Sequence, residues 1–363
     1  MQALLLAVAL VLSASPAGAV VAFELDDERI DESSGLAASS MRDGVVFTHN
    51  DSGDDARFFA VDDEGRTLAT YRLPDVQARD WEDMARGPDE RGRSSLWLGD
   101  IGDNSARRTD GILVHRVLEP VPGQDRRVRT APPESFRLLY PDGPTDAEGL
   151  AVHPTTGRLY VVAKPLGGPA PVYAAPQPLD PDGPNLLERV GEVRTRATGT
   201  VGGPGIGSLA QRLVTAAAFS PDGARFAVRT YTDVYEYAVS KGDLDAALRR
   251  DPAVTALPET RQGEGLTYTR DGAALLTSSE GRGAPVHRVP VADLTGAEQQ
   301  PGSGQQGSGQ QPGSEQQGSE QQQGSEQRAA GRRPLLLGGV GALLLVGGLL
   351  LRRRRTRAPG GRR

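Results

Sequence analysis

The chain has 363 residues and no cysteine, which excludes a disulfide scaffold, a thiolate metal site and a cysteine nucleophile. Residues 1–296 hold 31 basic and 43 acidic residues, whereas the last 36 residues hold ten arginines and no acidic residue. A body with a net charge of −12 argues against a nucleic-acid partner, which requires a basic surface, and suits divalent cations or basic partners.

The first segment, residues 1–19, has the pattern of a secretory signal peptide. An apolar stretch from Ala3 to Leu12 is followed by the small residues Ala17, Gly18 and Ala19. Small residues at these positions are typical of a signal-peptidase site, so we expect cleavage after Ala19. The alternative is a buried first helix.

Residues 20–296 contain an internal repeat. One short phrase returns five times: Ser34-Gly35-Leu36-Ala37, Glu82-Asp83-Met84-Ala85, Glu148-Gly149-Leu150-Ala151, Thr215-Ala216-Ala217-Ala218 and Glu264-Gly265-Leu266-Thr267. Its third positions are 48, 66, 67 and 49 residues apart, and after each phrase come further short segments rich in β-formers. Four antiparallel strands per unit at such periods predict an all-β fold, a β-propeller with four-stranded blades.

Five blades are favoured, and six are the alternative because the spacings 84–150 and 150–217 are long enough to contain another. The fifth unit has no obvious outer strand, while Val20 to Leu25 is a strand without a unit. We therefore expect this N-terminal strand to complete the last blade. A β-sandwich would leave the recurring phrase unexplained.

Beyond the propeller, three further segments are predicted. Residues 297–333 are rich in Gly, Ser, Gln and Glu and should form a disordered linker. Residues 334–351 are eighteen uncharged, mostly apolar residues, which at about 1.5 Å per residue nearly span a hydrocarbon core of about 30 Å. The arginines that begin the basic tail, residues 352–363, place that tail in the cytoplasm. These features predict a single-pass protein of the cell membrane with its propeller on the extracytoplasmic side.

Some phrases of the body resemble those of known proteins: Asp80-Trp81-Glu82-Asp83-Met84-Ala85, Gly99-Asp100-Ile101-Gly102-Asp103-Asn104, Asp146-Ala147-Glu148-Gly149-Leu150 and Phe219-Ser220-Pro221-Asp222-Gly223. They resemble bacterial exported β-propellers of the WD40-like and the phytase- or esterase-like groups. The chain lacks the Trp-Asp and Gly-His signatures of true WD40 repeats. The resemblance to phytase-like propellers implies a face that binds calcium and an anionic ester.

In a propeller, the start of the first strand and the end of the second strand of every blade lie at the same opening. This geometry brings together side chains that are distant in sequence. Glu82, Glu148, Glu264, Asp100 and Asp51 are the predicted metal ligands, and Lys164, Arg229, Glu280 and Asn50 are the predicted ligand- or anion-binding residues. Clustered carboxylates need a compensating cation, and Ca²⁺ is the candidate because it accepts carboxylate and amide oxygens.

Two alternatives stay open at this point. The glutamates can instead be structural, capping backbone amides or pairing with Lys164 and Arg229. The favoured function is a binding module whose acidic opening recognises a cell-envelope component or a protein. The alternative is a calcium-dependent phosphoesterase or esterase-like hydrolase, in which the metal polarises an ester.

Overall fold

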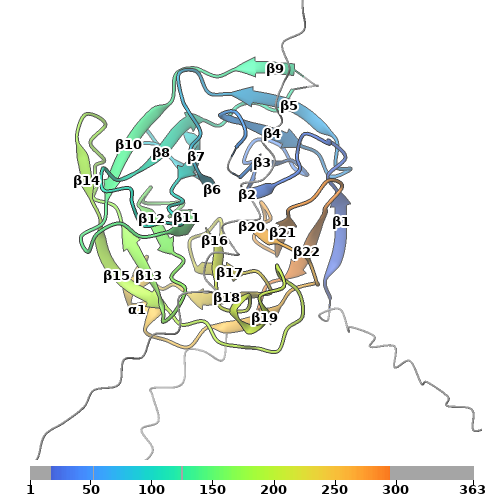
Figure 1. Ribbon diagram of the computed structural model, residues 1–363. Coiled ribbons are helices and arrows are strands. Elements are labelled where there is room, and N and C mark those ends of the chain that lie inside the picture. The colour runs from blue at the N-terminus through green and yellow to red at the C-terminus, as the bar shows by residue number, and fades with distance from the viewer. Residues whose placement is uncertain (1–17, 52, 124–125, 295–363) are drawn as a thin grey trace, which may run out of the picture. The chain divides into compact units, whose positions relative to one another are not determined.

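The computed structural model describes residues 18–51, 53–123 and 126–294. Within these residues, five sheets are arranged radially around one axis, as a β-propeller with five blades (Figure 1). The prediction of a five-bladed propeller is therefore confirmed. The predicted linker, membrane segment and basic tail lie outside the described residues, as does the predicted signal peptide apart from Gly18 and Ala19.

Each blade is a meander of four antiparallel strands, numbered from the axis outward. Blade 1 consists of β2 (Ser33–Ala38), β3 (Val46–Asn50), β4 (Arg57–Val61) and β5 (Thr67–Arg72). Blade 2 consists of β6 (Trp81–Pro88), β7 (Ser94–Asp100), β8 (Ile112–Leu118) and β10 (Glu134–Leu139). Blade 3 consists of β11 (Ala147–Val152), β12 (Leu159–Ala163), β13 (Ala170–Ala174) and β15 (Glu188–Val193). Blade 4 consists of β16 (Val214–Phe219), β17 (Arg225–Thr230), β18 (Asp233–Ala238) and β19 (Ala253–Ala256).

Blade 5 closes the ring with a strand from the other end of the sequence. Its inner strands are β20 (Gly263–Tyr268), β21 (Ala274–Ser279) and β22 (Pro285–Pro290), and its outer strand is β1 (Val20–Glu24). β1 pairs antiparallel with β22. This pairing confirms the expected closure, and it ties the first described strand to the last.

The two long spacings contain extra edge strands and no sixth blade. β9 (Arg126–Arg129) lies between β8 and β10 in the sequence but pairs in parallel with β5 of blade 1. β14 (Pro184–Leu186) precedes β15 but pairs in parallel with β10 of blade 2. Each insertion therefore reaches back and adds a fifth strand to the blade before its own.

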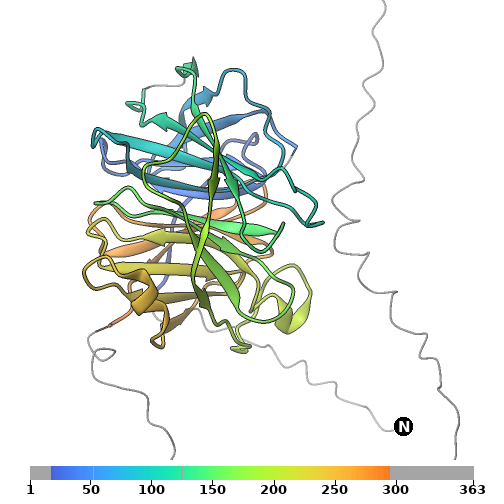
Figure 2. The same cartoon turned by 90° about the vertical axis from the view of Figure 1, so that its left-hand side faces the viewer.

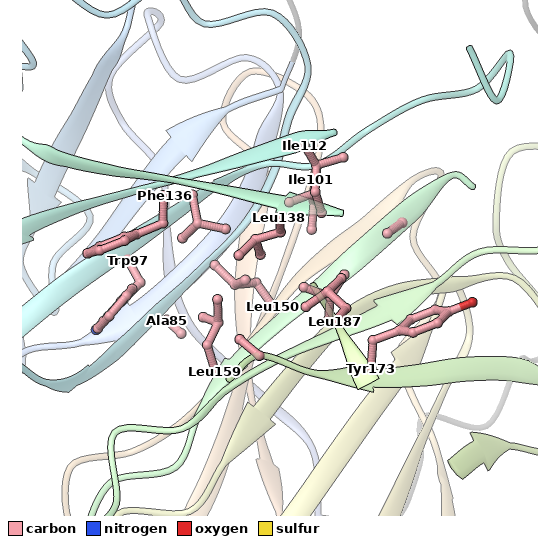
Figure 3. Packing of buried hydrophobic residues seen from close by; sticks show 14 of the residues in the cluster. Ala85, Trp97, Ile101, Ile112, Phe136, Leu138, Leu150, Leu159, Tyr173 and Leu187 are labelled. Atoms are coloured by element: carbon pink, nitrogen blue, oxygen red, sulfur yellow. The ribbon is translucent and has the colours of Figure 1, made fainter. Parts of the chain in front are cut away.

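The hydrophobic core is divided among the five interfaces between neighbouring blades. The strands nearest the axis are buried on both faces because each packs against a neighbour on either side, for example β11 between β6 and β16. Figure 3 shows the core between blades 2 and 3, where Trp97 stacks on Phe136 in one cluster with Leu150 and Leu159. In the side view the strands of successive blades lie in layers (Figure 2). This packing fixes the inner strands rigidly around the axis.

Helices contribute little to the described structure. They are one 3₁₀ turn, η1 (Gly207–Leu209), and one α-helix, α1 (Leu244–Leu248). No helix among the described residues has the length and apolar character that a membrane crossing requires.

Candidate functional site

Every inner strand carries a β-bulge near its first residue, opposite the end of the second strand. In blade 2 the pairing passes from Trp81 with Asp100 to Asp83 with Gly99, so Glu82 has no partner on β7. The other blades have the same irregularity. The homologous bulge positions are Ser34, Glu82, Glu148, Thr215 and Glu264. Because a bulge re-aims the displaced side chain, these positions surround one opening of the axis, which we call the mouth.

The residue that follows the second strand completes the mouth. In three blades its N–H donates to the carbonyl two residues before the bulge: Asp51 to Glu32 (2.9 Å), Lys164 to Asp146 (2.9 Å) and Glu280 to Gln262 (2.9 Å). In blade 2 the corresponding bond, to Asp80 (3.2 Å), comes from Gly102, the second residue after β7. Gly102 is the member without a side chain. A Cβ there would lie 2.1 Å from Glu82 Oε1 and 2.6 Å from the Asp80 carboxyl carbon. The two carboxyl groups therefore occupy the space that a side chain would take in blade 2.

Five carboxyl groups form two overlapping clusters at the mouth. Oxygens of Asp51, Asp80 and Glu82 lie within 4.8 Å of one another, and so do oxygens of Glu82, Asp146 and Glu148. Glu82 belongs to both clusters. Hard oxygen ligands in such a group suit Ca²⁺, which takes about six to eight of them. Three of the predicted metal ligands, Asp51, Glu82 and Glu148, are thus brought together.

Lys164 is the cation that lies among these carboxylates. Its Nζ donates to the Glu148 carboxylate and, at 2.9 Å, to the hydroxyl of Tyr231. Burial lowers the pKa of Lys164, but the negative charges of Glu148, Glu264 and Glu82 outweigh it, so the pKa is raised well above its usual value. Lys164 therefore stays charged. The structural alternative, an ion pair between a glutamate and Lys164, is realised for Glu148.

The remaining carboxyl groups of the mouth have little compensation. Glu264 is 5% exposed, and its Oε2 accepts no hydrogen bond from the described residues. Burial, with further repulsion from Glu280 and Asp51, raises the pKa of Glu264 to about 8 despite Lys164. Burial and the charge of Asp51 likewise raise the pKa of Glu280 to about 8 and that of Asp80 to about 7. The mouth thus holds more negative charge than one lysine can balance, which favours protons or a bound cation.

Asp83, next to the bulge of blade 2, closes the axis beneath the mouth. Its carboxylate accepts the backbone N–H groups of Leu150 (2.9 Å) and Ala217 (3.0 Å), which belong to the inner strands of blades 3 and 4. The residue is fully buried. This one side chain therefore ties three inner strands together next to the mouth.

Two predicted site residues are buried and bonded to other groups of the protein. Asp100, expected as a metal ligand, is 1% exposed and belongs to neither cluster. Its carboxylate pairs with Arg108 at 2.7 Å and accepts the backbone N–H groups of Arg79 (3.0 Å) and Asp80 (3.3 Å). Arg229, expected to receive an anion, is also 1% exposed, and its Nη1 donates to the carbonyls of Gly265 (2.5 Å) and Ser278 (2.6 Å). These partners direct its charge into the interface between blades 4 and 5.

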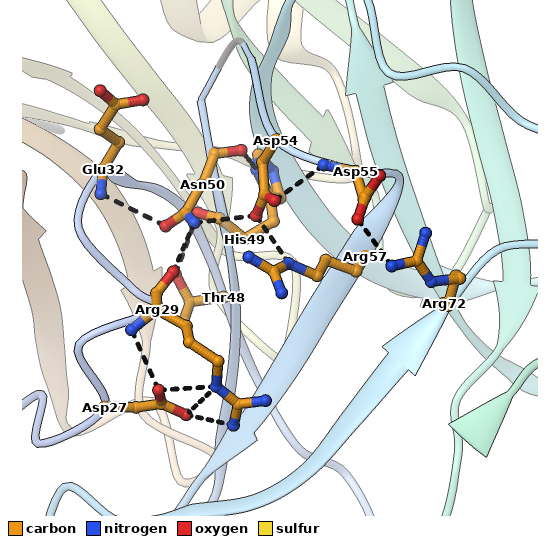
Figure 4. A network of polar contacts seen from close by, with 10 residues as sticks. All are labelled: Asp27, Arg29, Glu32, Thr48, His49, Asn50, Asp54, Asp55, Arg57 and Arg72. Carbon is orange, nitrogen blue, oxygen red and sulfur yellow. Dashed lines mark hydrogen bonds and ion pairs between the residues drawn. The ribbon is translucent and has the colours of Figure 1, made fainter. Parts of the chain in front are cut away.

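Asn50, another predicted ligand-binding residue, holds the chain entering blade 1. Its Nδ2 donates to the Arg29 carbonyl (2.7 Å) and to Asp54 (2.9 Å), and its Oδ1 accepts from the N–H of Glu32 (3.3 Å). Figure 4 shows Asn50 in the middle of this network. The amide is therefore used in supporting the loop that carries Asp51.

Asp80, Asp146 and Tyr231 are the mouth residues that the sequence analysis did not select. The two aspartates had a signal, because Asp-x-Glu occurs at both Asp80-Trp81-Glu82 and Asp146-Ala147-Glu148. Tyr231 occupies in blade 4 the position of Lys164, since Thr230 pairs with Val214 as Ala163 pairs with Ala147. Arg229, the residue predicted for that position, lies two residues earlier, within β17.

A groove elsewhere in the described residues is lined by none of the mouth residues. This groove, of about 700 Å³ at the outer part of blades 1 and 2, is lined by Tyr71, Arg116 and residues of β9. Arg116 is paired with Glu90 and Glu134 and lies 4.9 Å from the Trp97 ring. Its charge is thus neutralised within the groove, so the mouth is the stronger candidate site.

Comparisons with known proteins show only remote similarity. No family model matches the chain, and no curated protein matches its sequence. Among solved structures it is similar to XC5397 from Xanthomonas campestris, a gluconolactonase, with 12% identity and a TM-score of 0.40 over 76% of this chain and 91% of that chain. It is also similar to the WD40 repeats of RRP9, with 12% identity and a TM-score of 0.39 over 76% of this chain and 99% of that chain.

Proposed function

We propose that the protein is a binding module whose mouth holds a divalent cation, with calcium as the ion. The observation that carries this proposal is the pair of carboxylate clusters that share Glu82 on rigid inner strands. In the described residues neither Asp80 nor Glu82 has an ion-pair partner within 4.0 Å. A cation bound by Asp51, Asp80 and Glu82 would relieve the repulsion among them, and its free positions would face an incoming ligand.

The chain offers a matched control for a calcium test. Asp62, Asp63 and Glu64 also bring three carboxylates within 4.8 Å of one another, but Asp63 and Glu64 are exposed and Asp62 is paired with Arg66. Calcium titration of the full chain, purified in mild detergent, should show binding. Glu82→Gln should raise the Kd at least about tenfold, or about 1.4 kcal/mol, whereas Glu64→Gln should leave it unchanged. Absence of calcium binding, or equal effects of both variants, would disprove the assignment.

A hydrolase is the second candidate, and the raised pKa values favour it. Because the pKa of Asp80 is about 7 and those of Glu264 and Glu280 are about 8, these groups can hold or release a proton near neutral pH. Such perturbed groups beside a metal and a lysine are common at catalytic sites. In this function the metal would polarise a phosphate or carboxylic ester, and Lys164 would contact its anionic group.

Activity separates the two functions. Phosphate and acetate esters are offered to the full chain with calcium and with a chelator. Calcium-dependent hydrolysis that disappears in Glu148→Gln would establish the enzyme. Calcium binding without hydrolysis of any ester in the panel would favour the binding module.

We further propose that residues 334–351 anchor the propeller outside the cell membrane, where it binds a cell-envelope component or a protein. Because the chain has no cysteine, single cysteines report topology cleanly. On intact cells, a membrane-impermeant thiol reagent should label Ser308→Cys in the linker and leave Thr356→Cys in the tail unlabelled until the cells are opened. Labelling of both positions, or of neither, on intact cells would refute this orientation.

A further inference from the structure

Lys164 follows β12 directly and is held in place from two sides. Its side chain is 11% exposed, Nζ donates to Glu148 and to the Tyr231 hydroxyl, and Nζ lies 5.0 Å from the centre of the Tyr231 ring. Its backbone N–H is fixed by the carbonyl of Asp146. The ammonium group therefore has one defined position.

That position coincides with one of the two carboxylate clusters. Glu148 is a member of the cluster Glu82–Asp146–Glu148, and the charge of Lys164 acts on all three members. In the other cluster, neither Asp80 nor Glu82 pairs with a lysine or arginine of the described residues. The two clusters thus have similar oxygen ligands, and Lys164 forms its direct ion pair with Glu148, a member of the second cluster.

Glu264 is a second observation, independent of the clusters, for a divalent cation near Lys164. Its Oε2 is buried and accepts no hydrogen bond from the described part of the chain. Lys164 is the charged group that acts most strongly on it, and Glu148 also repels Glu264. Glu264 therefore has a buried carboxylate oxygen without a donor, and the charges of both Lys164 and Arg229 act on this carboxylate.

We propose that the mouth has two cation positions that share Glu82, and that Lys164 is a tethered cation occupying the second. The first position, formed by Asp51, Asp80 and Glu82, takes one divalent ion. A second divalent ion is excluded because the ammonium group already lies among its ligands and like charges repel at this distance. This inference rests on the proposed calcium site and adds its stoichiometry and the residue that sets it.

The test counts calcium ions per chain by equilibrium dialysis and by titration calorimetry on the full protein. Wild type should bind one ion, and Lys164→Arg should also bind one because it keeps the charge. Lys164→Met has a similar length and no charge. It should bind two ions, with Glu264 and Glu148 now available, and its first ion should bind at least about tenfold more tightly, or about 1.4 kcal/mol.

The outcomes separate a failure of this inference from a failure of the proposed calcium site on which it rests. A wild type without any bound calcium overturns the proposed function. One ion in wild type and also one in Lys164→Met overturns the tethered cation alone, as do two ions in wild type. If Lys164→Met is unfolded without metal, its circular dichroism is followed as calcium is added. Recovery of the wild-type spectrum with two bound ions supports the inference, and failure to recover at millimolar calcium refutes it.

Discussion

Replacing Glu264 by glutamine should stabilise the metal-free protein. Glu264 is 5% exposed, its Oε2 has no donor among the described residues, and its pKa is raised from 4.5 to about 8. Because the pKa is higher in the folded than in the unfolded state, folding is favoured most below about pH 4.5. That contribution is lost as the pH rises to about 8. Glutamine keeps the shape of the side chain and removes the titration.

The size of the effect follows from the pKa difference. With a folded-state value of about 8 against 4.5, each pH unit between them costs about 1.4 kcal/mol, so ionisable Glu264 weakens folding by up to about 4 kcal/mol at pH 7.5 and by about 1 kcal/mol at pH 5. Urea unfolding of the full chain, with a chelator present, measures the free energy of unfolding at pH 7.5 and at pH 5. We expect Glu264→Gln to be more stable than wild type by these amounts, with the larger gain at pH 7.5.

Glu236 provides the matched control, because it is a buried glutamate whose acceptors are used. Its carboxylate accepts from the Tyr268 hydroxyl (2.9 Å) and from the N–H of Ala292 (2.6 Å). Glu236→Gln should therefore destabilise the protein by about 1–3 kcal/mol. If Glu264→Gln is also less stable than wild type, or if its gain in free energy of unfolding does not increase between pH 5 and pH 7.5, the conclusion that the negative charge of the mouth is uncompensated is wrong.

Three further variants test the residues that support or border the mouth. Asp83→Ala removes the acceptor of three backbone N–H groups, those of Met84, Leu150 and Ala217, and should lower the free energy of unfolding by about 2–5 kcal/mol; a loss under 1 kcal/mol in urea unfolding would show that the axis is not held there. Arg108→Met removes the partner of buried Asp100 and should cost about 3–5 kcal/mol by the same measurement, with an unchanged midpoint as the contrary result. Gly102→Ala would place a methyl group 2.1 Å from Glu82 Oε1 and should raise the calcium Kd about tenfold with little change in stability; an unaltered Kd would place the ion elsewhere.

Much of the fold was predictable because a propeller repeats one local pattern. The recurring phrase marks the inner strand of each blade, and the segments after it alternate as strands do. The unit without an outer strand and the unassigned strand Val20–Glu24 predicted ring closure. β9 and β14 were not predictable in the same way. Their three or four residues carry no periodic signal, and their partners belong to the preceding blade.

The mouth was predictable in outline and not in detail. The phrase alone places Glu82 and Glu148 at equivalent positions, and the structure brings their carboxylates together. The mouth position of blade 4, by contrast, depends on where β17 ends. Its apolar residues end at Val228, whereas the strand continues to Thr230, so Arg229 was assigned where Tyr231 stands. Arg229 therefore lies within β17, and its charge is used between blades.

The character of the mouth comes from differences at equivalent positions, not from the repeat itself. Blades 2, 3 and 5 place glutamate at the bulge, whereas blade 4 places Thr215 there and Tyr231 at the following mouth position. Among the described residues, carboxyl groups therefore reach the mouth from blades 1, 2, 3 and 5, and blade 4 presents uncharged hydroxyl groups between them. A symmetric acidic ring would repel itself equally in all directions and could not orient a ligand. With this asymmetry, a cation has a preferred side, and Lys164, bonded to Tyr231, lies at the boundary between the carboxyl and the hydroxyl groups.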